Sequence, residues 1–472
     1  MLVLCILCSI FVSCKDDTPP TTVPNNGGGV EPTPTQKNEL GFEFLPEKDL
    51  EQYNWRLLMI DNEAATIFET EEEAAKGGVV SQAYFERDAW MMERYNITME
   101  SIAGGSGAIN TWILTNCMAG DDLYDIGVLH TTEQMAGVMT SDLTYDIKEL
   151  PYVDLTKPYY NQQANKEYTV LGKQVMMNGD YPCCGGSFSW FLFNKNYMTE
   201  LGLEYPYQII LDGDWTMEVF YEYCQNAYQD IDEVGGKSAG DKFGYAGCCP
   251  TTLFAGMGAT LTTKDENGAI MPSIANAFNE QRYAKIIEFM SQEWCYSEKE
   301  LDHNKNMYGT IQWFEGRTLF HHFQRYNTDL LKIETFDYGL AALPKYDEDQ
   351  EEYYAPAAGG VTIISANIRD PEKVGYILEA FGQITYDLLR PALVEDLREH
   401  RMLRDSESLE VYKLLQNHMV FSITKNVDPS NVLASDQIVY DCLVADRPSL
   451  SAYARDLEGM IKNYYTRFYY GS

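Results

Sequence analysis

Basic residues are scarce in this chain. Thirty-five Lys and Arg stand against 71 Asp and Glu in 472 residues, which leaves a formal charge of −36 at pH 7. Nucleic acids and anionic lipid surfaces bind through clustered Lys and Arg, because those side chains neutralise phosphate groups. The balance therefore excludes nucleic acid as a partner. It indicates a well-solvated surface that keeps the protein soluble and monomeric.

The chain also lacks motifs of metal and nucleotide chemistry. It contains no His-Glu-x-x-His, and Gly236-Lys237-Ser238 stands without the upstream glycine that a phosphate-binding loop requires. His321 and His322 are adjacent, so on a strand they would face opposite sides of the sheet and could not readily share one ion. We therefore expect no cofactor and no metal site. Calcium binding at the acidic run 347–352 is a minor alternative to a solvated loop.

Cysteine spacing does not match a zinc knuckle or a redox site. The eleven cysteines include two adjacent pairs, Cys183-Cys184 and Cys248-Cys249, and neither pair has Cys-x-x-Cys spacing. The two pairs could bridge each other outside the cell, and buried free thiols are an equal alternative. Connectivity does not follow from sequence, so both alternatives stand.

The apolar run at the N-terminus is too short to cross a bilayer as a helix. Residues 2–12 form an apolar segment of signal-peptide length that ends at Ser13-Cys14. The pattern resembles a bacterial lipoprotein signal, in which a small residue precedes the Cys that is acylated after cleavage. That resemblance implies a signal over residues 1–14, with Cys14 as the lipid anchor on the extracellular face of the cytoplasmic membrane. Residues 15–49 begin with a Pro-, Thr-, Asn- and Gly-rich stretch and are predicted to be a disordered tether.

Strand-like and helix-like patterns alternate from about residue 53. The predicted strands are 55–60, 97–102 and 125–130, and the predicted helices are 79–95, 107–118 and 131–139. This alternation predicts an α/β fold with parallel strands. Ligands of such sheets gather at the carboxyl ends of the strands. His130 ends the third strand and Thr131 follows it, so both are candidate ligand contacts.

Several short motifs follow one another in a consistent order. They are 121–127 (Asp-Asp-Leu-Tyr-Asp-Ile-Gly), 143–158, 172–175 (Gly-Lys-Gln-Val), 191–195 (Phe-Leu-Phe-Asn-Lys), 201–203 (Leu-Gly-Leu), 215–220 (Trp-Thr-Met-Glu-Val-Phe) and 314–317 (Phe-Glu-Gly-Arg). Together they resemble the extracellular solute-binding proteins of carbohydrate ABC transporters, the maltose-binding-protein-like group. The resemblance extends over roughly residues 55–389.

This resemblance implies two α/β lobes joined by hinge strands, with a ligand enclosed between them and a helical C-terminal part. Strand-like segments at 173–180, 318–326 and 359–365 stand where such a chain would cross between lobes. The predicted boundaries give lobe one residues 50–178 and 324–357, and lobe two residues 179–323 and 358–472.

The resemblance also implies positions for ligand contacts. The further candidates are Ser187, Trp190, Tyr245, Thr252, Arg325, Gly359 and Gly360. Arg325 could donate paired hydrogen bonds to sugar hydroxyls or to a carboxylate, and a salt bridge that holds the hinge is an equally good interpretation. The two glycines would let the backbone approach a ligand closely.

These patterns predict a lipid-anchored binding protein without enzymatic activity. It would capture a sugar or oligosaccharide and deliver it to an ABC transporter permease, touching the membrane only through its lipid. One alternative is a peptide, or a phosphorylated or acidic solute, on the same fold. A less favoured alternative is an extracellular glycosidase, because carboxylate pairs arise by chance among 71 acidic residues.

Overall fold

The computed structural model of the chain divides it into two compact units, residues 1–36 and 37–472. All residues that the structure describes lie in the second unit. They are 44–59, 70–104, 109–129, 135–181, 187–247, 250–297, 310–324, 335–358, 360–399, 402–427, 439 and 447–451.

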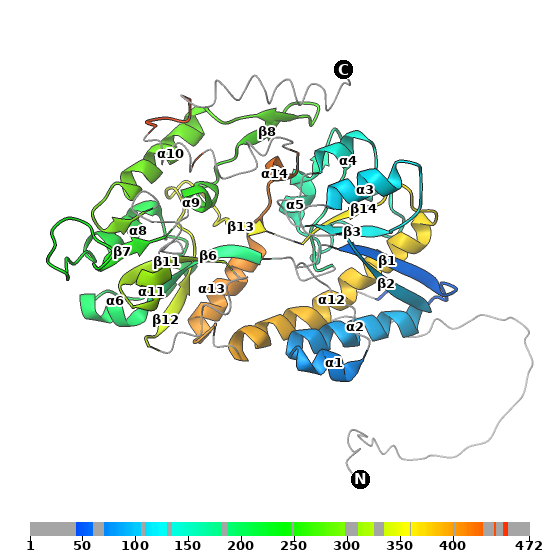
Figure 1. The fold of residues 1–472 in the computed structure, drawn as a ribbon, viewed down its shortest axis with the longest axis horizontal. Coiled ribbons are helices and arrows are strands. Elements are labelled where there is room, and N and C mark those ends of the chain that lie inside the picture. Colours follow the sequence, from blue (N-terminus) through cyan, green and yellow to red (C-terminus); the bar gives the residue numbers. More distant parts are fainter. Residues whose placement is uncertain are drawn as a thin grey trace, which may run out of the picture. The chain divides into compact units, whose positions relative to one another are not determined.

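The first sheet has four strands in the order β14-β3-β1-β2 (Figure 1). Its strands are β1 (Tyr53–Met59), β2 (Ile97–Ala103), β3 (Ile126–Leu129) and β14 (Val361–Ile364). β1 pairs in parallel with β2 and β3, and β14 runs antiparallel to β3. The helices between them are α1 (Glu71–Lys76), α2 (Val79–Tyr95), α3 (Ile109–Cys117) and α4 (Ala136–Thr140). The parallel α/β pattern predicted for this part of the chain is confirmed.

The second sheet has the order β10-β7-β11-β6-β13-β15, with β12 also paired to β6. Its strands are β6 (Ser187–Asn194), β7 (Phe243–Ala246), β10 (Cys295–Tyr296), β11 (Thr318–Gln324), β12 (Tyr338–Ala341), β13 (Ala355–Ala358) and β15 (Met419–Val420). β7 pairs in parallel with β10 and β11, whereas β6 runs antiparallel to β11, β12 and β13. Each sheet with its helices is called a lobe below, the first lobe for the first sheet and the second lobe for the second sheet.

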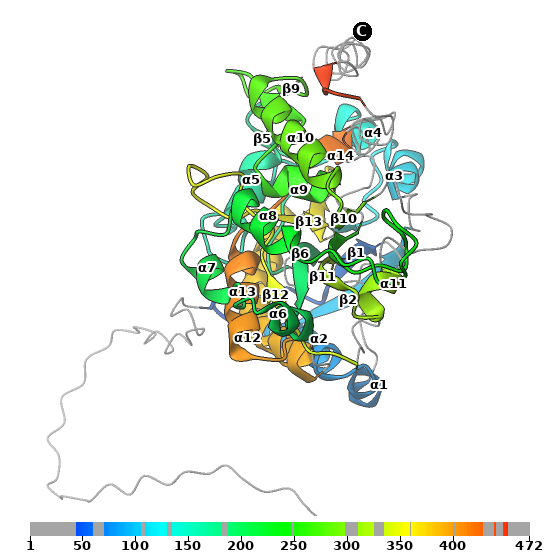
Figure 2. The same ribbon diagram turned by 90° about the vertical axis from the view of Figure 1, so that its left-hand side faces the viewer.

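Short helices and two hairpins surround the sheets (Figure 2). The remaining helices are η1 (Ile147–Glu149), α5 (Gln162–Glu167), α6 (Lys195–Leu201), α7 (Tyr207–Leu211), α8 (Met217–Gln225), α9 (Pro250–Gly256), α10 (Ala277–Met290), α11 (Thr310–Phe314), α12 (Pro371–Glu399), α13 (Ser406–Asn417) and α14 (Thr424–Val427). The hairpins pair β4 (Thr169–Val170) with β5 (Lys173–Gln174), and β8 (Thr262–Lys264) with β9 (Ile270–Pro272). Side-chain caps start several helices, because the first N–H groups of a helix have no partner within it. At α8, for example, the Thr216 side chain accepts a hydrogen bond from the Val219 N–H.

The structure places two segments in a different lobe from the one predicted for them. Residues 324–357 were assigned to lobe one, but β12 and β13 pair with β6 in the second sheet. Residues from 358 onward were assigned to lobe two, but β14 pairs with β3 and α12 packs on α2 in the first lobe. The predicted crossing at 318–326 is therefore not a crossing, because β11 and β12 both pair with β6. A strand's partner is chosen by hydrogen bonds to distant residues, and local patterns do not carry that information.

The folded body begins earlier than predicted, because residues 44–49 pack on the first lobe instead of belonging to the tether. The Phe44 side chain is buried, with its ring centroid 5.4 Å from that of Trp90. The Leu45 N–H donates a hydrogen bond to the Gln383 side chain, and the Tyr376 hydroxyl donates one to the Pro46 carbonyl. Residues 1–43 lie outside the described part of the chain.

Helix α12 is a single helix of 29 residues in the predicted helical C-terminal part. It continues through Pro391 and lies along α2 in Figure 1. Gly375 lets the first turns of α12 lie close to the backbone at Pro151, since a Cβ there would lie 2.0 Å from the Pro151 carbonyl oxygen. No described helix combines the length and the apolar composition that crossing a membrane would need.

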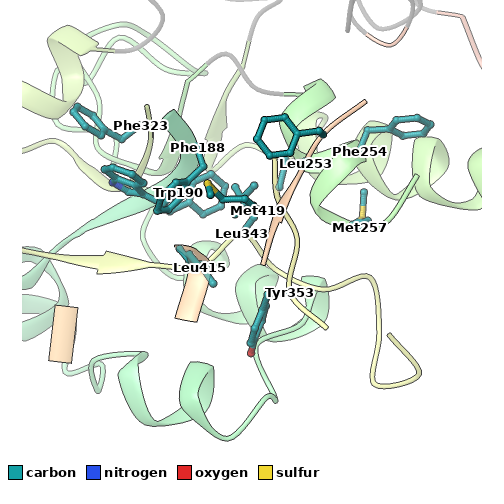
Figure 3. Close-up of a cluster of buried hydrophobic side chains, with 14 of the residues drawn as sticks. Phe188, Trp190, Leu253, Phe254, Met257, Phe323, Leu343, Tyr353, Leu415 and Met419 are labelled. Carbon is teal, nitrogen blue, oxygen red and sulfur yellow. The ribbon is translucent and has the colours of Figure 1, made fainter. Parts of the chain in front are cut away.

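The second lobe is held together by aromatic packing. Trp190 lies between Phe188, Phe323 and Tyr412, and Figure 3 shows it beside Phe188 and Phe323 in a buried cluster. Cys224 and Cys295 contribute buried free thiols to the same core. The two pairs of adjacent cysteines, Cys183-Cys184 and Cys248-Cys249, lie outside the described residues. Whether they form disulfides or free thiols therefore stays a prediction.

Candidate functional site

The edges of the two sheets meet where the chain crosses between the lobes. β13 ends at Ala358 in the second sheet and β14 begins at Val361 in the first. Val361 lies opposite Leu129, the last residue of β3, and Ala358 lies opposite Ser187. The carboxyl end of a parallel strand from the first sheet is thus at the crossing. Ligands of α/β folds gather at such edges.

The second sheet presents the same kind of edge to the crossing. β11 ends at Gln324, which lies opposite Ser189 on β6. Ser189 lies two residues after Ser187 on β6. Ser187 pairs with Ala358, the last residue of β13, after which the chain passes to the first sheet. Carboxyl ends of parallel strands from both sheets therefore flank one short connection. This region, called the crossing below, is the candidate ligand site.

Two of the segments predicted to cross between the lobes, 173–180 and 359–365, run side by side here. Met177 bridges Thr362 in antiparallel fashion, so the first segment runs beside β14. The buried Asn178 donates a hydrogen bond from Nδ2 to the Gly360 carbonyl at 3.0 Å. Gly360 has a φ of 70°, a conformation that residues with a Cβ rarely adopt. Gly360 therefore turns the backbone between the lobes, and its contact with a ligand stays a prediction.

A cavity of about 370 Å³ opens beside the crossing. Residues 158–163 and 178–180 line one side, and residues 416–420 line the other. Arg390 of α12 donates to the carboxylate of Asp180 at 2.6 Å. Burial raises the pKa of Asp180 to about 6, while the Arg390 guanidinium opposes that rise. The charges in this wall are therefore paired within the protein.

Glu379 supplies a second buried carboxylate near the same wall. It accepts hydrogen bonds from the hydroxyls of Tyr159 and Tyr160, the latter at 2.9 Å, and from the Asp154 N–H at 3.2 Å. Burial raises the pKa of Glu379, and the two tyrosine hydroxyls act in the opposite direction. This carboxylate anchors the segment before the crossing onto α12. The two tyrosines lie 220 and 219 residues before Glu379 in the chain.

The structure brings some predicted contacts to the crossing and places others in the core. Ser187 and Gly360 lie at the crossing. Trp190 is 1% exposed among aromatic rings, and its indole N–H has no partner within the described residues. Tyr245 is fully buried in β7, and Thr252 is half-buried on α9, which follows β7. His130, Thr131, Arg325, Gly359 and Cys14 lie outside the described residues.

The adjacent histidines face different surroundings, as their strand position predicts. The His321 Nδ1–H donates to the Ala246 carbonyl at 2.9 Å, and its ring stacks on Trp313. His322 lies on the opposite face, with its ring edge toward Phe191. Burial lowers the pKa of His321 to about 4 and that of His322 to about 3. Both imidazoles are therefore neutral at pH 7.

The loop between α8 and β7 contains a Gly-x-Ser-x-Gly sequence at 236–240, the spacing of a hydrolase nucleophile. A nucleophile elbow needs a sharp turn from strand to helix, and this loop runs from a helix to a strand. The Ser238 hydroxyl donates to the Asp232 carboxylate and accepts from the Gly240 N–H. Asp241 accepts from the Ser238 N–H in turn. The serine therefore stabilises its own loop.

Asp180, Glu379 and Arg390 were not singled out from sequence. The polar run 178–180 directly after an apolar strand is a local signal for the first of them. Arg390 is 210 residues from Asp180, and nothing local connects the two. Their pairing depends on α12 returning to the first lobe.

No protein-family model and no curated protein sequence matches the chain. Solved structures do match it over most of its length. The sugar-binding protein MalE from the phytopathogen Xanthomonas citri aligns over 88% of this chain and 98% of its own, at 12% identity and a TM-score of 0.60. A sugar transporter protein from Rhizobium etli in an open conformation aligns over 87% and 99%, at 14% identity and a TM-score of 0.59.

A third solved structure is the cyclic alpha-maltosyl-1,6-maltose binding protein from Arthrobacter globiformis. It aligns over 87% of this chain and 99% of its own, at 14% identity and a TM-score of 0.56. Nearly the whole length of each of these proteins is covered. The chain therefore has the two-lobed fold of MalE and similar sugar-binding proteins.

Proposed function

We propose that the protein captures a sugar or oligosaccharide between its two lobes outside the cell and delivers it to the permease of an ABC transporter. The observation that carries the proposal is the crossing, where carboxyl ends of strands from both sheets meet. Three proteins of the same fold are named for sugars or for sugar transport. A ligand held at the crossing touches both lobes, so its binding favours the closed arrangement.

The cellular setting belongs to the same proposal. Cys14 carries the lipid anchor, and residues between it and Phe44 act as the tether of a monomeric, non-enzymatic binding protein. The proteins of similar fold are binding and transport proteins, which supports a binding role. Contacts to the ligand come from Ser187 and Gly360, together with His130, Thr131, Arg325 and Gly359, which adjoin the described ends of β3, β11 and β13.

A thermal-shift panel tests the ligand class. The panel contains glucose, maltose, maltotriose, a cyclic maltodextrin, a sugar acid, a sugar phosphate and a tripeptide. A true ligand raises Tm in proportion to the logarithm of its concentration above Kd. We expect at least one neutral oligosaccharide to do so without being cleaved, as judged by chromatography of the mixture. A shift by the peptide alone, or product formation, would overturn the proposal.

Arg325→Ala tests the proposed contact next to β11. We expect it to weaken binding of the sugar found in the panel by about tenfold or more, because one charged hydrogen-bonding side chain contributes about 1.5–3 kcal/mol. Calorimetry gives the affinity, and the melting temperature shows whether the fold survives. Arg369→Ala is the matched control, since the Arg369 side chain is 81% exposed and pairs only with Asp122 in the described contacts. Equal affinity for both variants would limit Arg325 to a supporting role.

A further inference from the structure

A segment of the second lobe passes across the first lobe after α13. We call residues 421–427 the strap. It leaves the second sheet at β15, which pairs in parallel with β13 through Ala355 and Met419. The Phe421 N–H then donates to Gln163 Oε1 at 2.7 Å, and the Phe421 carbonyl accepts from Gln163 Nε2 at 3.0 Å. The two bonds dock the backbone of Phe421 on the amide of one side chain.

Helix α5, which carries Gln163, belongs to the first lobe. The hairpin that follows it is tied to that lobe, because the Gln174 N–H donates to Asp146 at 3.0 Å. The Tyr145 N–H in turn donates to Ile364, the last residue of β14. The end of α5 also receives the strap, since the Ile423 N–H donates to the Glu167 carboxylate at 3.0 Å.

The strap continues to the edge of the first sheet. The Asn426 carbonyl accepts a hydrogen bond from the Met135 N–H at 2.7 Å. Met135 directly precedes α4, and only residues 130–134 separate it from the carboxyl end of β3. The strap therefore runs from β15 to Met135 at the start of α4, six residues beyond the end of β3.

Beyond the strap the chain is attached to the second lobe again. The Tyr283 hydroxyl of α10 donates to the Arg447 carbonyl at 2.8 Å. The N–H groups of Leu450 and Ser451 donate to the carboxylate of Glu280, also on α10. The strap thus follows directly on a strand of the second sheet and lies on the first lobe, and the described chain next contacts the second lobe at Arg447.

Apolar burial and a neighbouring hairpin reinforce the docking. Phe421 is 3% exposed with its ring centroid 6.2 Å from that of Tyr168, and Ile423 is fully buried. The Thr424 hydroxyl bonds that of Thr262 at the base of the β8–β9 hairpin, and Figure 1 shows α14 and α5 below β8. From the same hairpin, Lys264 Nζ donates to the carbonyls of Lys166 and Glu167 at 2.6 and 2.7 Å. The ammonium thus meets carbonyls that the end of α5 leaves unpaired.

Lobe opening has a geometric consequence for these contacts. Because β15 joins the start of the strap to the second sheet, separating the lobes must detach the strap from α5 and Met135 or pull β15 away from β13. The contacts of Gln163, Glu167 and Lys264 join the two lobes, so lobe separation has to break or displace them. Contacts present in one state alone set the equilibrium between the two states.

We propose that the strap is a latch of the closed state, which controls how readily the lobes open and release their ligand. The latch role rests on the proposed function for the ligand, while the docking itself is a property of the protein without ligand. Gln163 is its central positioning residue, because its amide pairs with both the N–H and the carbonyl of Phe421.

Gln163→Ala in the ligand-free full chain is the test, with Gln163→Glu as a graded variant. Alanine removes both bonds, whereas glutamate keeps the acceptor for the Phe421 N–H. Gln208→Ala is the matched control. The Gln208 amide donates a hydrogen bond to the carboxylate of Asp212, the residue that caps the end of α7, and both are far in sequence from the strap. Hydrogen exchange reports on strap docking, and small-angle X-ray scattering reports on lobe opening.

We expect amide exchange in peptides covering 419–427 to rise about tenfold in Gln163→Ala, less in Gln163→Glu and not in Gln208→Ala, since two hydrogen bonds are lost. The radius of gyration should rise in the same order. Faster exchange with an unchanged radius of gyration would overturn the latch. An equal rise of exchange in β6 and α10 would also overturn it, because the strap would then be an integral part of the core.

Maltotriose provides the functional arm of the experiment. If it binds, stopped-flow tryptophan fluorescence should show faster release from Gln163→Ala than from the wild type, and equal release would count against the latch. If maltotriose and the other sugars do not bind, the sugar-capture proposal fails. The exchange and scattering results still decide the latch, because both are measured without ligand.

Discussion

At the scale of single residues, burial decides what the polar side chains of the second lobe do. His321 is 7% exposed and donates a hydrogen bond to the Ala246 carbonyl, on the neighbouring strand β7. Losing water disfavours the charged imidazolium, so burial holds the pKa of His321 at about 4. His321 is therefore a neutral hydrogen-bond donor between two neighbouring strands.

Replacing His321 should change the acid stability of the protein. Its folded-state pKa of about 4 is below the ordinary value of 6.5, so the unfolded chain takes up a proton at a higher pH than the folded protein does. Stability is therefore complete above pH 6.5 and is lost as the pH falls toward 4. In urea unfolding, the wild type should lose up to about 3 kcal/mol more than His321→Gln over this range.

Glutamine is the informative replacement because it can donate to Ala246 and does not titrate. His322 remains in both proteins, and burial is the main cause of its lowered pKa, so its own effect largely cancels in the difference. Parallel stability curves for the two proteins between pH 7 and 4 would show that His321 is not buried in its neutral form.

At the scale of elements, the turn between α11 and β11 depends on one glycine. Gly316 has a φ of 69°, and its N–H donates to the Trp313 carbonyl at the end of α11. The Arg317 N–H donates to the Gln312 carbonyl, which completes the helix end. This geometry aims the next residues into β11 between β6 and β7.

Gly316→Ala should lower the free energy of unfolding by about 1–2 kcal/mol, because a Cβ is strained at positive φ. The space itself is sufficient, since a Cβ at this position would lie 3.5 Å from its nearest neighbour, an atom of the Phe336 ring. Chemical denaturation measures the change. Gly316→Asn is the matched control and should lose less, because asparagine tolerates this conformation better. Equal losses would mean that contact with Phe336, and not backbone strain, sets the cost.

At the scale of the whole molecule, charge and topology determine different properties of the protein. The charge of −36 lies on a chain with only 35 basic residues, so the folded state carries strong self-repulsion. Topology is set by two sheets that share one crossing, and by α12 and the strap, which both return to the first lobe late in the chain. The charge affects stability and partners, whereas the topology decides where a ligand can lie.

Salt should therefore stabilise the protein. Raising NaCl from about 20 mM to about 500 mM shortens the screening length and weakens repulsion among carboxylates, so we expect Tm to rise by a few degrees. Differential scanning calorimetry measures the shift. KCl serves as the control and should act equally, because screening does not depend on the identity of the cation. A falling Tm, or a rise in NaCl alone, would contradict the screening account.

The amino-acid sequence by itself determined the local features of this protein. The predicted helix 79–95 is α2, and the predicted strands at 55–60, 97–102 and 125–130 are β1, β2 and β3 within a few residues. The ordered motifs also indicated the two-lobed fold. These features depend on periodicity and backbone conformation, which neighbouring residues set.

Only the tertiary structure decided which strands share a sheet and which side chains meet. β12 and β13 pair with β6, Arg390 reaches Asp180, and the strap lies on Gln163. Trp190, predicted to face a ligand, is instead enclosed by rings from β6, β11 and α13. Each outcome joins residues far apart in the chain, and the free energy of burying them together exists only once the chain has folded.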